Sequence, residues 1–141
     1  MKISARNKFE GTISAVNAGP ISTEVVLDVA GGDKLVAVVT SESAKRLGLA
    51  AGKRAAGFVK APSVTLVTDA GSYRFSARNQ FAGQVAQLSK GAVNSEVSIR
   101  LASGTVVSAV VTNEAVAELQ LASGKPATAL IKASQVILGV A

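Results

Sequence analysis

The tetrapeptide Ser-Ala-Arg-Asn occurs twice in this chain, at residues 4–7 and 76–79, and a Phe and a Gly follow each copy. A serine hydroxyl is a neutral donor, and an arginine guanidinium presents a planar fork of N–H donors that fits an oxyanion. Alternate side chains of a strand share a face, so the Ser and the Arg of each copy are expected to point the same way. Lys60 and Lys132 recur before the last strand of each copy. Since first and last strands meet readily in a small barrel, the three side chains are expected to form an anion pocket together with backbone N–H groups.

Purely structural roles for the same residues stay open at this point. The Arg of each copy could pair with a glutamate that also recurs, Glu24 or Glu96. Asn7 could only shape a β-bulge, and Lys60 could be an edge-strand charge that deters aggregation. Spacing and residue type alone do not decide between these roles and an anion site.

The two copies belong to a longer repeat. A shift of the sequence by 72 positions aligns residues 3–69 with residues 75–141 without a gap, and 26 of the 67 aligned positions are identical. The residues between the copies are short and polar, as is typical of a domain linker. The repeat therefore predicts two domains, 1–69 and 75–141, joined by a linker at 70–74.

Each repeat has the pattern of short strands with one helix. The helix of the first repeat is expected to be capped by Thr40 or Ser41 and to turn Ala44 and Leu47 inwards, and the second helix is expected at 113–121. Three strands, a helix and two strands are the order of an OB-fold, a partly open Greek-key barrel. We therefore predict an all-β protein of two tandem OB-folds, with another small barrel as the alternative. The strands expected in the first repeat are 3–16 (interrupted near Gly11), 23–29, 35–39, 55–59 and 64–67.

Composition excludes several classes of protein. The chain contains no His and no Cys, which excludes Ser–His and Cys–His nucleophile pairs, disulfides and the usual transition-metal sites, so we expect no enzyme and no metal-cation cofactor. No apolar run is long enough to span a membrane, and the N-terminus lacks the apolar core of a secretory signal, so we expect a cytoplasmic protein without a membrane partner. The net charge of +6 favours anionic partners, although the basic residues are scattered. A mean hydropathy of +0.38 predicts apolar surface buried between subunits.

Three pairs of segments resemble a known family. SARNKFEGTI and SARNQFAGQV, VTSESAKRLGL and VTNEAVAELQL, and FVKAPSVTL and LIKASQVIL are similar to the molybdenum-pterin-binding (Mop) domains. Two such domains in one short chain resemble the di-Mop molbindins. The resemblance implies a cytoplasmic homotrimer that stores molybdate, with tungstate as an analogue and no organic cofactor, and that holds the oxyanions at subunit interfaces for molybdenum homeostasis.

The resemblance also implies which residues bind the oxyanion. It also implies a second class of site, for which the loops around Ser22 and Asn94 are the candidates. Where the second repeat has Ser134, the first has Pro62, which lacks both an N–H and a hydroxyl, so the sites of the two repeats are expected to differ. The implied ligands of the main class are Ser4, Arg6, Lys60, Ala61 and Pro62 in the first repeat, and Ser76, Arg78, Lys132, Ala133 and Ser134 in the second.

Two other functions compete with this one. An OB-fold can bind single-stranded nucleic acid by stacking bases on aromatic side chains, but the recurring aromatic pair, Phe9 and Phe81, is expected to lie in the core, so no nucleic-acid partner is predicted. A ligand-sensing module of a larger regulator is the other alternative. Both halves of this chain are accounted for by the repeats, so a free-standing store is favoured.

Overall fold

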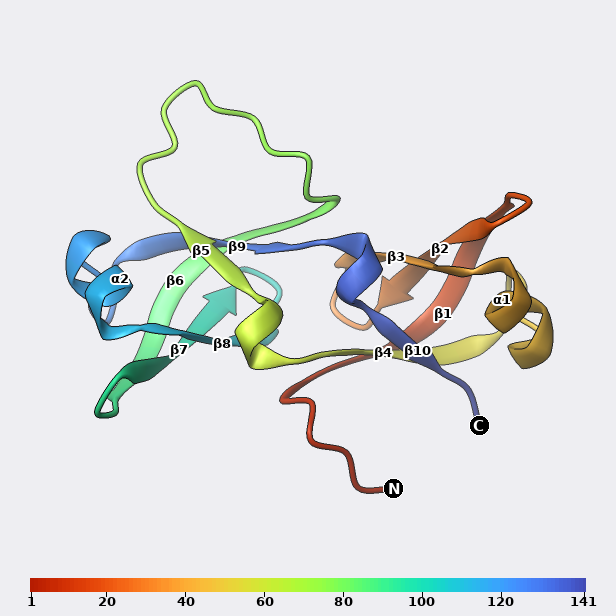
Figure 1. The fold of residues 1–141 in the computed structure, drawn as a ribbon, viewed down its shortest axis with the longest axis horizontal. Coiled ribbons are helices and arrows are strands. Elements are labelled where there is room, and N and C mark those ends of the chain that lie inside the picture. Colours follow the sequence, from red (N-terminus) through yellow and green to blue (C-terminus); the bar gives the residue numbers. More distant parts are fainter. The chain divides into compact units, whose positions relative to one another are not determined.

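A computed structural model describes all residues from 1 to 141 and shows the same series of elements twice. In each repeat, three strands precede a short helix, and a fourth strand, one 3₁₀ turn and a last strand follow (Figure 1). This order confirms the one predicted from the sequence. The first repeat comprises β1 (Asn7–Ala18), β2 (Ser22–Val29), β3 (Lys34–Thr40), α1 (Ser41–Leu47), β4 (Arg54–Val59), η1 (Ala61–Ser63) and β5 (Thr65–Val67). The second comprises β6 (Asn79–Lys90), β7 (Asn94–Leu101), β8 (Val106–Thr112), α2 (Asn113–Glu118), β9 (Pro126–Ile131), η2 (Ala133–Gln135) and β10 (Ile137–Gly139).

The strands form two antiparallel five-stranded sheets. One sheet has the order β10-β4-β1-β2-β3 and the other the order β5-β9-β6-β7-β8. In the first sheet β10 and η2 also contact β3 at the far edge, and in the second β5 and η1 contact β8. Each sheet therefore curls on itself, and the fold is all-β with two OB-type barrels, as predicted.

The compact units differ from the sequence repeats. One unit consists of Met1–Val59 with Lys132–Ala141, and the other consists of Lys60–Ile131. The last strand of each repeat is exchanged, because β10 pairs with β4 and β5 pairs with β9. The linker expected at 70–74 separates the two sequence repeats but lies inside the second compact unit. The chain passes from one unit to the other at Lys60 and again at Lys132. Sequence could not predict this, because β4 and β9 offer similar edges to either short last strand.

The long first strand is continuous, contrary to the interruption expected at Gly11. The register shifts instead between Ile13 and Ala15, where a β-bulge lies, and the second repeat has its bulge at the matched place. Gly11 is needed for a different reason: a Cβ there would lie 1.9 Å from the main-chain oxygen of Asp28 on β2. The glycine permits a close approach of two strands.

Alternation of side chains along the strands builds the two cores. In β2 the buried residues are Thr23, Val25, Leu27 and Val29, and the residues between them face outwards. The expected face of Val25, Leu27 and Val29 is therefore confirmed. The aromatic pair Phe9 and Phe81 is also buried, at 2% and 8% exposure.

The helices are short and their N-caps match the expectation. Thr40 caps α1 by accepting a hydrogen bond from the Ser43 N–H at 3.1 Å, and α1 ends at Gly48 in a left-handed conformation. Ala44 is buried and Leu47 only half-buried. The second helix is shorter than predicted, since α2 stops at Glu118. Neither helix is long and apolar enough to cross a membrane.

The strand exchange predicts the behaviour of a chain cut between its repeats. A protease site inserted between Gly71 and Ser72, in the segment without helix or strand that follows β5, gives two fragments after cleavage. We expect the fragments to elute together on gel filtration without denaturant, because β5 stays hydrogen-bonded to β9 and β10 to β4. The matched control carries Leu66→Asp and Leu138→Asp, which prevent burial of the two exchanged strands, and its fragments should separate. Separation of the unmodified fragments would contradict the exchange.

Candidate anion-binding site

Ser4 and Arg6 lie just before β1 and not within it, contrary to the strand expected from residue 3. Both side chains are exposed, and β1 begins at Asn7. The physical reason is the length of the partner strand: β4 ends at Val59, which pairs with Asn7, so earlier residues have no ladder to join. The second repeat is arranged alike, with Ser76 and Arg78 preceding β6.

The pairing of first and fourth strands brings the predicted cations to one end of each sheet. Asn7 pairs with Val59 in an antiparallel ladder. Arg6, which precedes Asn7, and Lys60, which follows Val59, are therefore both attached to the same end of this strand pair. Asn79 pairs with Ile131, which gives Arg78 and Lys132 the same relation. The sequence had suggested that the first strand of each repeat meets the last one. In the structure, the first strand pairs with the fourth strand instead. Each repeat therefore has an Arg and a Lys directly beyond the terminal residues of this strand pair.

The Asn of each repeated tetrapeptide does not shape a bulge. Asn7 and Asn79 are buried, and each side-chain Nδ2 donates a hydrogen bond of 3.2 Å to the carbonyl oxygen of the residue that faces it, Val59 or Ile131. The bulges lie further along the strands. The amide ties the two strands together at the point where the candidate site begins.

A 3₁₀ turn follows each predicted lysine. Lys60 and Lys132 are exposed, and their carbonyl oxygens accept hydrogen bonds of 2.9 Å from the N–H groups of Ser63 and Gln135. The next residue of each turn, Ala61 or Ala133, is buried and anchors the turn. Position 62 holds an exposed proline and position 134 an exposed serine. The turn of the second repeat therefore offers an N–H and a hydroxyl that the first lacks.

The alternative ion pair between Arg6 and Glu24 is not supported by the register. Glu24 pairs with Asn17 near the far end of β1, whereas Arg6 precedes the beginning of that strand. Glu96 pairs with Ser89 in the second repeat, again far from Arg78 along the strand. Each recurring glutamate therefore lies toward the opposite end of its sheet from the recurring arginine of the same repeat.

Ser22 and Asn94 do not join these clusters. Each begins the second strand of its repeat and is exposed, and each carbonyl oxygen accepts a hydrogen bond from a glycine N–H, Gly19 at 3.0 Å or Gly91 at 2.8 Å. Because β2 runs antiparallel to β1, these loops lie at the opposite end of the sheet from Arg6 and Arg78. A second class of site there would be separate from the first.

Sequence reasoning missed the polar residues that hold these two loops. The buried Thr23 hydroxyl hydrogen-bonds with that of Ser41 at 2.8 Å, and Ser41 Oγ donates to the Gly19 carbonyl oxygen at 2.6 Å. In the second repeat the Ser95 hydroxyl donates to Asn113 Oδ1, and Asn113 Nδ2 donates to the Gly91 carbonyl oxygen at 2.8 Å. The available signal was a polar residue at an inward-facing position of β2 and of β7.

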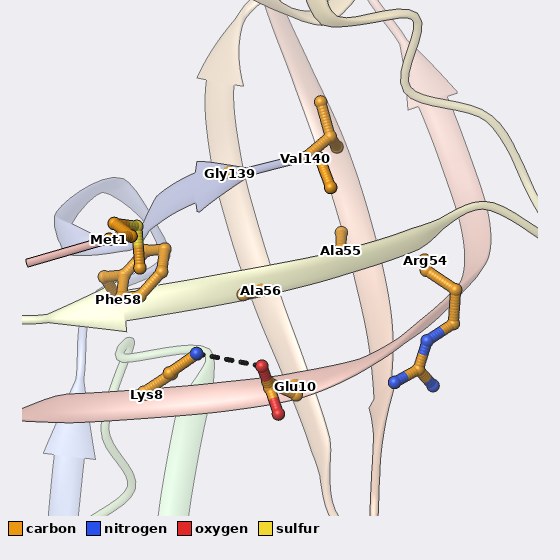
Figure 2. A pocket seen from close by; sticks show the side chains of 10 residues that line it. Met1, Lys8, Glu10, Arg54, Ala55, Ala56, Phe58, Gly139 and Val140 are labelled. Carbon is orange, nitrogen blue, oxygen red and sulfur yellow. Dashed lines mark ion pairs between the residues drawn. The ribbon is translucent and has the colours of Figure 1, made fainter.

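A cavity of about 460 Å³ lies away from all of these residues, on the outer side of β1 and β4 (Figure 2). Phe58 and Ala56 line it, and Lys8 Nζ forms an ion pair with Glu10 Oε1 at 2.9 Å on its rim. The hydrogen bond and the charge of Lys8 lower the pKa of Glu10. The second repeat has Gln80 and Ala82 at the matched positions, so these charges are not a shared feature of the repeats. No group of three or more His, Cys, Asp or Glu side chains is placed to hold a metal ion.

The fold defines a protein of two tandem OB-type barrels, in which an Arg precedes the first strand and a Lys follows the fourth strand of each repeat. The chain belongs to the TOBE domain family, whose profile matches residues 3–66 and 76–138. The match covers both repeats, and confirms that they are two domains of one family.

Solved and curated relatives agree with this assignment. The crystal structure of the cytoplasmic molybdate-binding protein ModG, with molybdate bound, is 56% identical, covers all of both chains and superposes with a TM-score of 0.97. The molybdenum transport protein ModE of Herbaspirillum seropedicae is 44% identical over 99% of this chain and 52% of its own length. A probable molybdenum-pterin-binding protein of Haemophilus influenzae is 46% identical over 48% of this chain and 97% of its own length. The chain thus spans about half the length of ModE, and the smaller relative matches about half of this chain.

Proposed function

We propose that this protein binds molybdate, with tungstate as a close analogue, and serves as a cytoplasmic molybdenum store. The observation that carries the proposal is that, in both repeats, an Arg directly precedes and a Lys directly follows the terminal residues of the same strand pair. The likeness to the molybdate-binding protein ModG over the whole chain supports the same ligand. The proposed ligands are Ser4, Arg6, Lys60, Ala61 and Pro62, and Ser76, Arg78, Lys132, Ala133 and Ser134, with Ser22 and Asn94 in a second class of site.

The chemistry of the cluster suits a fully deprotonated tetrahedral dianion. Arg and Lys side chains are donors with no acceptor, and serine hydroxyls and main-chain N–H groups add neutral donors. Molybdate carries no proton at neutral pH, whereas a protonated phosphate would need an acceptor. Discrimination against sulfate then depends on the size of the pocket.

We further propose a homotrimer in which the oxyanions lie between subunits. Several large apolar side chains are exposed in the single chain, including Ile21 at 80%, Val93 at 71% and Ile137 at 56%. Burial of such side chains between copies would remove apolar surface from water. An oxyanion bound between copies would stabilise the assembly by mass action.

Binding and not catalysis is the proposed activity. The chain has no His and no Cys, and therefore lacks the usual nucleophile–base pairs. Binding of single-stranded nucleic acid is less well supported, because Phe9, Phe58 and Phe81 are buried, and Tyr73 is the one strongly exposed aromatic side chain on which a base could stack.

Calorimetric titration with molybdate tests the proposed ligand and its arginine. We expect saturable binding of molybdate, and Arg78→Ala should weaken binding at its site by roughly tenfold to a hundredfold, since a hydrogen bond to a charged group contributes about 1.5–3 kcal/mol. The matched control is Arg100→Ala, which removes an exposed arginine of the same unit near the C-terminal end of β7. Absence of heat with the folded wild type, or equal isotherms for the two variants, would refute the proposal.

The difference between the turns predicts unequal sites. Pro62→Ser adds an N–H and a hydroxyl to η1, so the affinity of the first-repeat site should rise, and Ser134→Pro should lower that of the second. Both side chains are exposed, so the fold should tolerate either change. Titrations fitted with two classes of site measure the effect. Isotherms that neither substitution alters would show that these turns do not contact the anion.

Light scattering after gel filtration tests the assembly. At micromolar concentration we expect a mass of about three times the 14.2 kDa chain, because burial of the exposed apolar side chains drives association. Molybdate should shift any residual monomer toward the assembled form. A monomeric mass with and without molybdate would contradict the trimer and the sites between subunits.

A further inference from the structure

The Asn of each repeated tetrapeptide is its buried member. Asn7 is 3% exposed and Asn79 2% exposed, whereas the Ser and the Arg before them are exposed. Each amide Nδ2 donates 3.2 Å to the carbonyl oxygen of the facing residue, Val59 or Ile131. No buried side-chain nitrogen or oxygen lacks a hydrogen-bond partner. The amide is therefore a satisfied polar group inside the protein and not a ligand exposed to an anion.

These amides are placed where the strand ladder ends. The pairs Asn7–Val59 and Asn79–Ile131 close their ladders, and on the next residues the chains leave the sheet as Arg6 and Lys60, or Arg78 and Lys132. Strand ends fray because their last hydrogen bonds are exposed and weakly supported. A buried side-chain hydrogen bond at that position opposes fraying in both strands at once.

We propose that Asn7 and Asn79 are positioning residues for the oxyanion sites, an inference that rests on the proposed function. Each buried amide fixes the strand end so that the Arg and the Lys of its repeat hold their mutual position before the anion arrives. A substitution that keeps the branched shape but removes the donor deprives the facing carbonyl oxygen of this hydrogen bond. The two cations then separate in the empty site, and the anion must order them again when it binds.

The matching of the two repeats supports a role in the site and not only in the barrel. Positions next to Asn7 on the same strand, such as Lys8 and Glu10, change to Gln80 and Ala82 in the second repeat. Val59 also changes to Ile131, but its carbonyl oxygen accepts the same hydrogen bond. The amide is thus kept together with the Ser, the Arg and the Lys, while the exposed positions next to it on the strand vary.

The test compares two destabilised variants of the full chain. Asn79→Leu removes the donor and keeps the same number and branching of side-chain heavy atoms. The control Phe81→Leu removes core volume two residues further along the same strand, at a side chain that is 8% exposed. Both are titrated with molybdate at a temperature at which circular dichroism shows them folded. Asn79→Leu should weaken binding at the second-repeat site by about fivefold to tenfold, and Phe81→Leu should leave it unchanged even where it lowers the melting temperature more.

Hydrogen exchange without molybdate gives a readout that general destabilisation does not mimic. Amides of residues 76–78 and 132–134 should exchange faster in Asn79→Leu than in Phe81→Leu, and molybdate should restore their protection. Should Asn79→Leu fail to fold, Asn79→Ser replaces it, and its affinity and hydrogen exchange are compared with those of Phe81→Leu in the same way. Equal affinity and equal exchange in the two variants would overturn the positioning role.

Arg78→Ala in the wild-type background separates this inference from the proposed function. Loss of binding in Arg78→Ala with normal binding in Asn79→Leu overturns only the positioning role. Normal binding in Arg78→Ala removes the proposed site, and the positioning role falls with it.

Discussion

The antiparallel pairing of the first and fourth strands of each repeat is the contact on which the candidate sites depend. Those strands end together at Asn7 and Val59, and at Asn79 and Ile131. A buried side-chain amide adds a hydrogen bond at each end. A guanidinium and an ammonium that are far apart in sequence therefore emerge at one edge of a sheet. The rest of the barrel, with its small buried side chains and its capped helix, supports that edge.

The duplication separates what the fold requires from what varies freely. Glycines that let two strands approach closely recur, as Gly11 and Gly83 do, because a Cβ at either position would collide with a carbonyl oxygen. The loop before the second strand is held in both repeats by a polar side chain at the start of the helix, although the residue is Ser41 in one and Asn113 in the other. The hydrogen bond to the loop carbonyl oxygen is preserved there, while the side chain that donates it changes. Among the proposed ligands of the main class of anion site, by contrast, the Ser, the Arg and the Lys keep both residue type and place, and only Pro62 and Ser134 differ.

The exchange of last strands makes the two repeats dependent on each other. Neither sheet is complete without a strand from the other repeat, since β10 extends the first sheet and β5 the second. A 3₁₀ turn follows each of Lys60 and Lys132, which are the points at which the chain leaves one compact unit for the other. The residues proposed to hold an oxyanion thus include those at which the strand exchange begins.

Sequence alone determined the repeat, the order of the elements, the inward faces of the strands and the residue types of the candidate site. These follow from local patterns: alternation along Val25, Leu27 and Val29, a threonine cap, and an Arg and a Lys kept in both copies. Only the tertiary structure decided which strand pairs with the one that follows Arg6, which sheet receives β5, and that Asn7 turns inwards to donate a hydrogen bond to Val59. The reason is that pairing between distant strands depends on edges and lengths, and two similar repeats offer nearly the same edges to a three-residue strand.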